Sequence, residues 1–340
     1  MTREDPPGLD LGRLRAYLDE QSPGLVDGPL SAEIVAGGRS NLTYIVGDGT
    51  SRWVVRRPPL GHVLPTAHDM SREHRVISAL RPTRVPVPGT IALCQDTEVL
   101  GAPFYVMDFV PGKPYRDADE LAALGPERTR AIADALTDTL VDLHAVRPDE
   151  VGLGDFGRPD GFLARQVRRW KKQLDASRSR GLDGIDRLHE RLAAAVPVSG
   201  PAAIVHGDYR LDNVLIDESD RITAVLDWEM STLGDPLTDL ALLVVYAERE
   251  RANLAVVSNV SSAPGYPGID EVVARYAQRS SRDISALNWY VGLGFFKLAV
   301  ILEGIYYRYS HGQTVGTGFD EIGAAVVPLV RLGNETLKEA

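Results

Sequence analysis

The sequence predicts an α+β protein with a small β-rich N-terminal lobe and a larger helical C-terminal lobe. Within the first 110 residues, short runs of strand-forming residues alternate with turn signals. From residue 126 onward, apolar residues instead recur with the spacing of one helix face. The segment PGKP at 111–114 separates the two patterns. We therefore expect an N-terminal lobe over residues 1–110 and a C-terminal lobe over residues 111–340.

The N-terminal lobe is expected to begin with a helix and to continue with strands. Leucines recur on one helical face along residues 9–18. The runs SAEIVAGG, NLTYIVGDG and RWVVRRPP predict strands, because GDG is a hairpin signal and Pro58 ends the last run. An amphipathic pattern predicts a helix over residues 71–80, with Ser71 as its candidate N-cap. Two further strands are expected near residues 90–94 and 103–110.

The C-terminal lobe is expected to consist mainly of helices. Apolar periodicity predicts helices at 126–145 and 161–176, and the pattern is helical again from residue 236. Between them, NVLID and ITAVLD predict a strand hairpin. The most apolar long stretch is residues 290–307, which Lys297 and Glu303 interrupt. The runs between these charges are too short to span a membrane.

Composition and charge limit the class of function. The 340 residues are 44% apolar and 25% charged, which is typical of a soluble globular protein. The formal net charge of −10 is unfavourable for sequence-independent binding to nucleic acid. The single cysteine, Cys94, cannot form an intramolecular disulfide, and the first ten residues do not resemble a signal peptide. We therefore expect a cytoplasmic protein without a nucleic-acid or membrane partner.

Polar residues stand among apolar runs in IVHGDYRLDNVLIDESDRITAVLDWE, residues 204–229. Asp208 precedes the first expected strand of the hairpin, Asn213 begins it, and Asp227 ends the second. Oxygen-bearing side chains such as Asn213 and Asp227 suit Mg²⁺, and the Asp208 carboxylate suits a base for a hydroxyl proton. Phosphoryl transfer requires such groups, because a metal ion binds the phosphates and a carboxylate orients the acceptor oxygen.

The spacing of these residues supports phosphoryl transfer. In protein-kinase catalytic loops, the base Asp stands five residues before a metal-binding Asn, and Asp208 and Asn213 have the same offset. The motif HGDYRLDN followed by LDWE resembles the aminoglycoside phosphotransferase and choline-kinase branch of the protein-kinase-like fold. That branch has His-Gly-Asp where protein kinases have His-Arg-Asp. The resemblance covers about residues 30–330.

The resemblance implies a role for each of these polar residues. Asp208 would be the catalytic base, and Asn213 and Asp227 would hold Mg²⁺. The segment GDPLTDLA at 234–241 also matches the branch, in which its second aspartate would brace the catalytic loop. Helix capping explains this aspartate, Asp239, equally well.

The resemblance also implies that the N-terminal lobe holds ATP. The segment AGGRSNLTYIV at 36–46 stands where a phosphate-covering hairpin belongs, although it departs from the protein-kinase G-x-G-x-x-G pattern. Gly38 would let the backbone approach phosphate, and Ser40 and Asn41 would add hydrogen-bond donors.

The third strand would supply a cation for the nucleotide phosphates. Kinases place a Lys here, but this chain has no lysine before Lys113. Of Arg56 and Arg57 only one can face the cleft, because side chains alternate along a strand. The resemblance favours Arg56, whose guanidinium can bind phosphate bidentately. Glu73 would be its ion-pair partner, unless Glu73 is only a solvated helix charge.

The segment FYVMDFVPG matches the connection between the lobes in this branch. Backbone groups of Asp108, Phe109 and Val110 would meet adenine, and Met107 would pack behind it. An ordinary buried strand would also explain the segment.

The acceptor implied by the resemblance is a hydroxyl group of a small molecule. RRPP, REHRVISAL, RQVRRW and DWEMSTLGDPLTDLA are most similar to the kinase-like domains grouped with acyl-CoA dehydrogenases. This similarity implies a hydroxylated metabolite, for example a hydroxyacyl-CoA. The basic run RRWKK at 168–172 would attract an anionic acceptor, unless it is only a solvated helix face. An aminoglycoside or a macrolide is the alternative acceptor, and a non-catalytic nucleotide-binding regulator and a metal-dependent hydrolase are alternatives of other classes.

Overall fold

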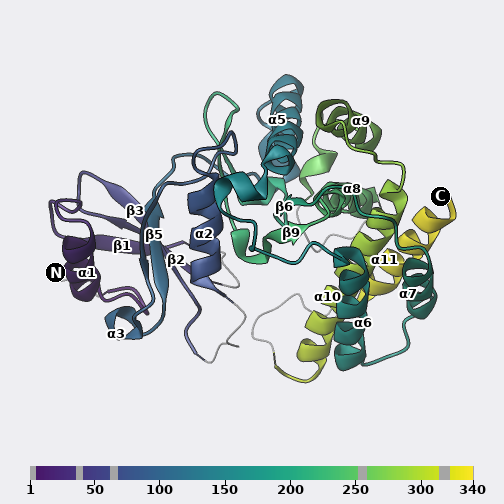
Figure 1. The fold of residues 1–340 in the computed structure, drawn as a ribbon, viewed down its shortest axis with the longest axis horizontal. Helices are drawn as coiled ribbons and strands as arrows, with labels where there is room; N and C mark the ends of the chain where they lie inside the picture. The colour runs from purple at the N-terminus through teal and green to yellow at the C-terminus, as the bar shows by residue number, and fades with distance from the viewer. Residues whose placement is uncertain (1–4, 36–40, 62–67, 252–258, 314–321, 340) are drawn as a thin grey trace. The chain divides into compact units, whose positions relative to one another are not determined.

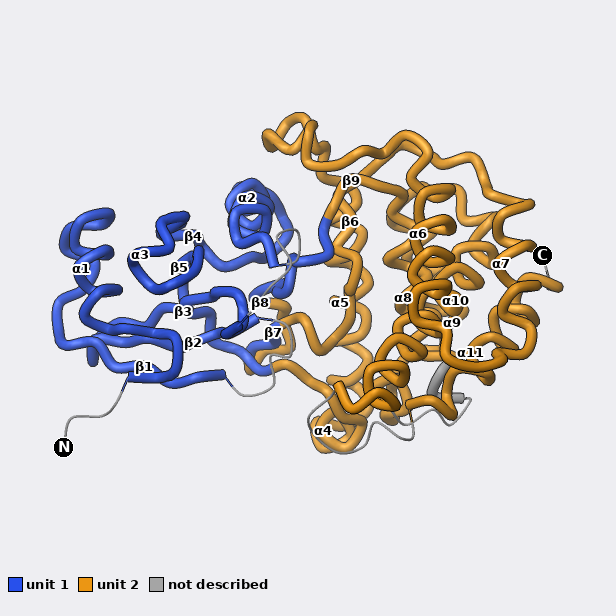
Figure 2. The backbone as a smooth tube through the Cα atoms, turned by 90° about the horizontal axis from the view of Figure 1, so that it is seen from below, with its two compact units in different colours: residues 1–113, 215–217, 223–231 blue, residues 114–214, 218–222, 232–340 orange. Residues whose placement is uncertain are grey.

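The structure, a computed structural model, describes residues 5–35, 41–61, 68–251, 259–313 and 322–339 (Figure 1). The chain divides into two compact units (Figure 2). The first unit comprises Met1–Lys113, Leu215–Asp217 and Thr223–Ser231, and the second comprises Pro114–Val214, Glu218–Ile222 and Thr232–Ala340. The chain therefore leaves the first unit after Lys113 and returns to it twice.

The first unit contains an antiparallel sheet with the strand order β1-β2-β3-β5-β4. Its strands are β1 (Ser31–Ile34), β2 (Leu42–Gly47), β3 (Arg52–Arg57), β4 (Thr90–Cys94) and β5 (Phe104–Asp108). The turn between β2 and β3 is fixed by Asp48, whose carboxylate accepts hydrogen bonds from the backbone N–H groups of Thr50 (2.9 Å) and Ser51 (2.7 Å). Gly49 has a φ of +99°, a conformation that favours glycine, so the hairpin predicted from GDG is confirmed.

Helices cover both faces of this sheet (Figure 1). They are α1 (Leu11–Gln21), α2 (Met70–Leu80) and α3 (Thr97–Leu100). Phe104 and Val106 of β5 pack in an apolar core with Leu14 and Leu18 of α1. Side chains alternate along a strand, so Tyr105 points to the opposite face, where its hydroxyl donates to a carboxylate on α2. One face of the sheet therefore supplies the core, and the other presents polar groups.

The predicted N-cap of α2 is wrong. The helix begins at Met70, and its N-cap is Asp69 instead of Ser71. The Asp69 carboxylate accepts hydrogen bonds from the backbone N–H groups of Ser71 (3.0 Å) and Arg72 (3.1 Å). Ser71 thus lies inside the first turn, where it is a donor to the cap.

The second unit is mainly helical, and its helices confirm the periodicity of the sequence. They are α4 (Ala118–Ala122), α5 (Pro126–Ala145), α6 (Phe162–Ser177), α7 (Ile185–Ala194), α8 (Leu237–Arg251), α9 (Ile269–Ser280), α10 (Leu287–Ser310) and α11 (Ile322–Thr336). Short 3-10 helices of this unit are η1 (Pro148–Val151), η2 (Leu211–Asn213), η4 (Val260–Ser262) and η5 (Leu337–Glu339), whereas η3 (Trp228–Met230) belongs to the first unit. The remaining strands are β6 (Ala203–Val205), β7 (Val214–Ile216), β8 (Ile222–Val225) and β9 (Thr232–Gly234).

These short strands form two pairs. β6 pairs with β9 in the second unit, and β7 pairs with β8. The hairpin of β7 and β8 is joined to the first unit by backbone hydrogen bonds, from Lys113 to Ile216 (2.9 Å) and from Val225 to Pro86 (2.8 Å). These short strands therefore position the candidate site residues, since Asn213 directly precedes β7 and Asp227 follows β8.

Helix α10 is the central helix of the second unit and packs against α6, α8 and α11 (Figure 1). Its 24 residues are long and apolar enough to cross a membrane, but 78% of its most apolar window is buried in the protein. Packing within the helical unit thus accounts for its apolar composition. Glycines on α10 permit close approach, since a Cβ atom on Gly294 would lie 2.8 Å from Val245 Cγ2 of α8.

Gly294→Ala should lower the free energy of unfolding by about 1–3 kcal/mol, because the added methyl group overpacks the contact between α8 and α10. Urea titration measures this loss. In a Val245→Ala background the colliding methyl groups are absent, so the same substitution should cost at least about 1 kcal/mol less. Additive losses in the double variant would contradict the close contact.

Candidate functional site

The loop that follows β6 is held from below by a buried carboxylate. Asp239, on α8, is fully buried and accepts hydrogen bonds from the backbone N–H groups of His206 (2.7 Å) and Gly207 (2.8 Å). Gly207 has a φ of +86°, which favours glycine at this position. Asp235 instead caps α8, because its Oδ1 accepts from the N–H of Leu237 (3.1 Å). The two aspartates of GDPLTDLA thus bind different partners.

His144 connects this carboxylate to the helical core. Its Nε2 lies 3.3 Å from Asp239 Oδ2, and its Nδ1 lies 2.8 Å from the Tyr276 hydroxyl. Burial lowers the pKa of His144, against the raising effect of Asp239. Burial opposes ionisation of Asp239, but the bonds from His144 and Gly207 outweigh it and lower the pKa of Asp239 below its ordinary value. The carboxylate that braces the loop is therefore ionised at neutral pH.

Both carboxylate oxygens of Asp208 are held by neutral donors. The Tyr246 hydroxyl donates to Asp208 Oδ1 (2.8 Å), and Asn213 Nδ2 donates to Oδ2 (3.1 Å). Asn213 Nδ2 also donates to the Asp208 carbonyl (2.8 Å), which closes the loop over five residues. The Asp208 side chain keeps 30% of its surface exposed. The carboxylate is consequently both oriented and accessible.

A cationic side chain of α10 contacts this loop within the second unit. Lys297 Nζ, from α10, donates to the Gly207 carbonyl (2.9 Å) and lies 5.7 Å from the centre of the Trp170 ring. Burial lowers the pKa of Lys297, against the raising effects of Asp208 and Asp239, and the nearby Arg169 lowers it further. Arg169 stands over the same indole at 5.5 Å. The loop next to Asp208 therefore contacts a cationic side chain of α10, and Arg169 of α6 lies near that side chain.

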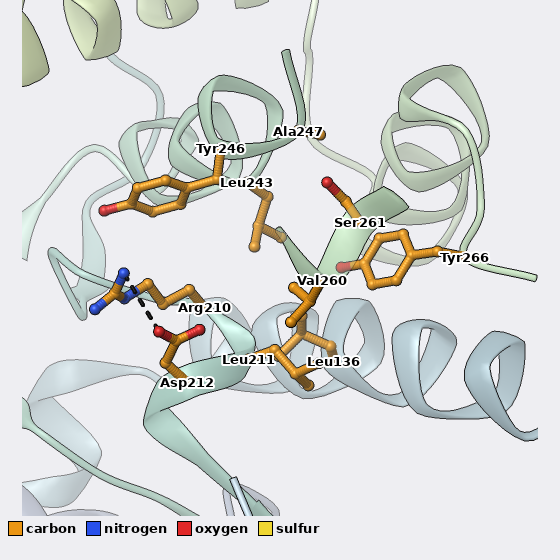
Figure 3. A pocket seen from close by; sticks show the side chains of 10 residues that line it. All are labelled: Leu136, Arg210, Leu211, Asp212, Leu243, Tyr246, Ala247, Val260, Ser261 and Tyr266. Atoms are coloured by element: carbon orange, nitrogen blue, oxygen red, sulfur yellow. Dashed lines mark ion pairs between the residues drawn. The ribbon is translucent and has the colours of Figure 1, made fainter. Parts of the chain in front are cut away.

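A small cavity lies beside the loop, on the side of Arg210 and Tyr246 (Figure 3). Its volume is about 30 Å³, which is the space of roughly one water molecule. Arg210 reaches Asp208 Oδ2 at 3.5 Å and Asp212 Oδ2 at 3.6 Å. The cavity is lined by Leu136, Arg210, Leu211, Asp212, Leu243, Tyr246, Ala247, Val260, Ser261 and Tyr266. It is too small to hold an acceptor molecule.

In the first unit, Arg56 stands at the centre of an ion-pair cluster. Arg56 Nε lies 2.9 Å from Glu73 Oε2, Arg56 also pairs with Asp227, and Glu229 Oε2 lies 4.0 Å from its guanidinium. Arg57 points the other way, is buried, and donates to the Leu100 carbonyl (2.7 Å). The alternation of side chains along β3 therefore places Arg56, and not Arg57, beside Glu73 and Asp227.

Glu73 is almost fully buried and accepts hydrogen bonds from the Tyr105 hydroxyl (3.0 Å) and from Asn41 Nδ2 (3.1 Å). Burial and the like charges of Asp227 and Glu229 raise the pKa of Glu73 to about 7, against the lowering effect of Arg56. Three carboxylates thus lie around the Arg56 guanidinium. Asn41, which we expected to donate to phosphate, donates here to Glu73 and Glu229 (3.3 Å).

The residues expected to bind Mg²⁺ flank the short hairpin. Asn213 ends η2 immediately before β7, and Asp227 follows β8 with a left-handed φ of +64°. Amide and carboxylate oxygens fit Mg²⁺, which usually takes one or two carboxylates together with waters and substrate phosphates. Among the described residues, no group of three or more His, Cys, Asp or Glu side chains forms a metal cage. Each of the two side chains thus offers an oxygen of the kind that Mg²⁺ takes.

The other residues expected to contact the nucleotide are placed as follows. Gly38 and Ser40 lie outside the described residues. Met107 is buried in β5, and the Asp108 N–H donates to the Gly89 carbonyl (2.8 Å). Candidate backbone contacts for adenine are therefore the Asp108 carbonyl and the backbone groups of Phe109, whose ring stacks on a guanidinium at 3.9 Å, and of Val110.

Sequence reasoning missed three side chains in these clusters. Glu229 belongs to the LDWE motif, yet it received no role. Lys297 was interpreted only as a charge that interrupts an apolar stretch, although an isolated charge there signals a buried partner. Tyr246 stands seven residues after Asp239, a spacing that places both on one face of a helix.

Comparison with known proteins gives matches to phosphotransferases. Residues 31–272 match the model of a family described as a phosphotransferase enzyme family. Acyl-CoA dehydrogenase family member 11 of Gallus gallus is 35% identical over 341 residues, which cover 97% of this chain and 44% of that protein. The chain thus spans less than half the length of the curated relatives it matches.

Solved structures agree with this match. A candidate aminoglycoside phosphotransferase from Ralstonia eutropha JMP134 is 33% identical, with a TM-score of 0.84 over 97% of this chain and 99% of that one. A thermostable mutant of aminoglycoside phosphotransferase APH(4)-Ia, solved with AMP-PNP and hygromycin B, is 16% identical. Its TM-score of 0.60 covers 94% of this chain and 98% of that one, which shows the same protein-kinase-like fold.

His144 predicts a pH dependence of stability. Because burial lowers its pKa in the folded protein, only the unfolded chain binds a proton as the pH falls below about 6.5. The contribution of neutral His144 to the free energy of unfolding is present above that pH. It is lost below it, by up to about 1.4 kcal/mol per pH unit. Urea titrations between about pH 5 and pH 7 should show a smaller slope for His144→Gln than for the wild type. His311→Gln, at an exposed histidine, is the control, and an unchanged slope in His144→Gln would contradict the assignment.

Proposed function

Because the chain belongs to the phosphotransferase enzyme family, we propose that it transfers the γ-phosphate of ATP to a hydroxyl group of a small molecule in a Mg²⁺-dependent reaction. The observation that carries this proposal is the arrangement of Asp208. Its carboxylate is oriented by Tyr246 and Asn213, stands on a loop braced by Asp239, and remains accessible. A base that receives a hydroxyl proton needs this combination of order and access.

The nucleotide would be held by the first unit. Arg56, buried and paired with Glu73, would steady the phosphates, while Asn41 would act through Glu73. Backbone groups of Phe109 and Val110 would contact adenine. ATP is proposed because the APH(4)-Ia structure of similar fold contains its analogue AMP-PNP.

Asn213 and Asp227 are the proposed ligands of Mg²⁺, which when bound would offset phosphate charge. Asp227 also pairs with Arg56, so a bound cation would share this carboxylate with the guanidinium. The second unit would then contribute the acceptor side of the reaction.

The proposed transfer is a single displacement. The acceptor oxygen forms a bond to the γ-phosphorus as the bond between that phosphorus and the β–γ bridging oxygen breaks, which releases ADP. The proton of the acceptor hydroxyl passes to Asp208. The same carboxylate orients the hydroxyl before transfer. The transfer rate therefore depends on the position of the carboxylate and also on its basicity.

We propose an anionic or uncharged hydroxylated metabolite, such as a hydroxyacyl-CoA, as the acceptor. Lys297 places positive charge on the loop that carries Asp208, and Arg169 lies near Lys297. These charges would attract phosphate or carboxylate groups and repel a polycation. The name of the relatives, acyl-CoA dehydrogenase family members, agrees with an acyl-CoA acceptor.

An aminoglycoside is the second candidate acceptor. It is favoured by the likeness to the Ralstonia eutropha structure at 33% identity. The cations near Asp208 argue against it, because aminoglycosides are polycations. A macrolide, and a regulatory role without catalysis, have no separate support from the described residues. A cytoplasmic location without nucleic-acid or membrane partners is part of this proposal.

Replacing the base tests the proposal directly. Asp208→Asn keeps the shape of the side chain but removes its basicity, so the transfer rate should fall at least about 100-fold while the affinity for Mg-ATP stays within about twofold. Mass spectrometry of a panel of hydroxyacyl-CoAs, aminoglycosides, a macrolide, choline and homoserine incubated with labelled ATP measures the transfer. Asp208→Ala should give the same result. Undiminished turnover in both variants would remove Asp208 from the reaction.

The charge of Lys297 tests the class of acceptor. For an anionic acceptor, Lys297→Met should raise KM by about 10- to 100-fold, because a hydrogen-bonded charge contributes that much to binding. Steady-state kinetics with the acceptor found in the panel measures KM, and Lys297→Arg is the control that retains the charge. A lower KM in Lys297→Met would instead indicate a cationic acceptor.

A further inference from the structure

Helix α8 contacts the candidate catalytic loop at two places. Asp239 binds the backbone N–H groups of His206 and Gly207, and Tyr246 binds the side chain of Asp208. Asp239 and Tyr246 are seven residues apart, which is close to two turns of helix, so both side chains leave the same face of α8. One rigid element thus fixes the loop backbone and also reaches the carboxylate that follows it.

We propose that Tyr246 is a positioning residue, which fixes the carboxylate of Asp208 in the orientation that phosphoryl transfer requires. The proposal rests on the role of Asp208 proposed above. It adds that α8 sets both the backbone and the side-chain geometry of the base.

The hydrogen bonds of Asp208 show what Tyr246 contributes. Asn213 donates to Oδ2 and to the Asp208 carbonyl. By itself, Asn213 would restrain only one carboxylate oxygen, and the Asp208 side chain could still rotate about its bonds. The Tyr246 hydroxyl restrains the other oxygen at 2.8 Å. An acceptor hydroxyl must meet a carboxylate lone pair within hydrogen-bond distance, and a small misplacement lowers the rate steeply.

The tyrosine is itself held in place by its surroundings. The Arg210 guanidinium lies 5.5 Å from the centre of the Tyr246 ring. Leu243, one turn earlier on α8, lines the small cavity together with Tyr246 and Val260. Figure 3 shows that the Tyr246 hydroxyl points away from Ser261 and Tyr266, which lie on the opposite side of this cavity. The ring therefore lines the cavity, and its hydroxyl points toward the loop.

The neutral character of this donor is suited to a base. A cation in direct contact with Oδ1 would hold the carboxylate as firmly but would stabilise its charge and reduce its affinity for a proton. A phenol hydroxyl orients the oxygen with a smaller electrostatic effect. Arg210 forms an ion pair with the other oxygen only, with its Nε 3.5 Å from Oδ2.

Tyr246→Phe tests the proposal, since it removes one hydroxyl and keeps the ring. We expect kcat to fall about 10- to 100-fold, while KM for the acceptor and for Mg-ATP stays within about twofold, because positioning acts on the transfer step and not on binding. Steady-state kinetics with the acceptor identified by the panel measures both constants. Tyr266→Phe, at the far side of the same cavity, is the matched control and should leave kcat within about twofold. The unfolding midpoint of Tyr246→Phe should stay close to that of the wild type.

Several results would overturn the proposal. An unchanged or higher kcat would show that Asp208 does not need the hydroxyl. A higher acceptor KM at unchanged kcat would make Tyr246 a binding residue, and a large loss of stability would make its role structural. Asp208→Asn is measured in parallel. If that variant retains turnover, the proposed function fails, whereas an inactive Asp208→Asn with a fully active Tyr246→Phe refutes the role of Tyr246 alone.

Discussion

The buried carboxylate of Asp239 is the constraint on which the candidate site depends. It is fully buried and ionised, and it is compensated by two backbone N–H groups and by His144. Such charge-assisted bonds are short and directional, so they fix the positions of His206 and Gly207. Asp208 is the next residue, and its backbone direction is set by them. A change in the ionisation of Asp239 would therefore reach the base without any contact to substrate.

The first unit contains a different electrostatic arrangement. Around Arg56 stand the carboxylates of Glu73, Asp227 and Glu229, and burial of Glu73, together with the like charges of the other two, raises its pKa to about 7. Loss of hydration for several carboxylates is unfavourable unless further positive charge is supplied. A divalent cation bound at Asp227 would supply it. The ion pairs of this cluster are present in the protein without ligand, and Asp227 of the same cluster would bind the cation of Mg-ATP in the proposed function.

The sequence predicted the parts of this arrangement that local pattern determines. Helix α5 runs from Pro126 to Ala145, as the apolar periodicity required. The cap of α2 was misplaced because Asp69 and Ser71 are both good capping residues, and the entry of the chain into the helix decides between them. The hydroxyl of Tyr246 was not recognised, since its contact with Asp208 depends on how α8 packs below the loop. The sequence pattern predicted a single boundary between the lobes near residue 110. The chain also returns to its first unit at residues 223–231, which a single boundary does not describe.

The positive charge of Lys297, next to the loop, bears on which acceptor the protein would bind. A cation on the most apolar helix is costly unless its charge is compensated, and here the Gly207 carbonyl, the Trp170 ring and the nearby carboxylates provide that compensation. If Asp208 takes up a proton during transfer, one of those negative charges disappears. The ammonium would then be compensated by negative charge on the acceptor and on the transferred phosphoryl group. An anionic acceptor fits this requirement, even though the whole chain carries a net charge of −10.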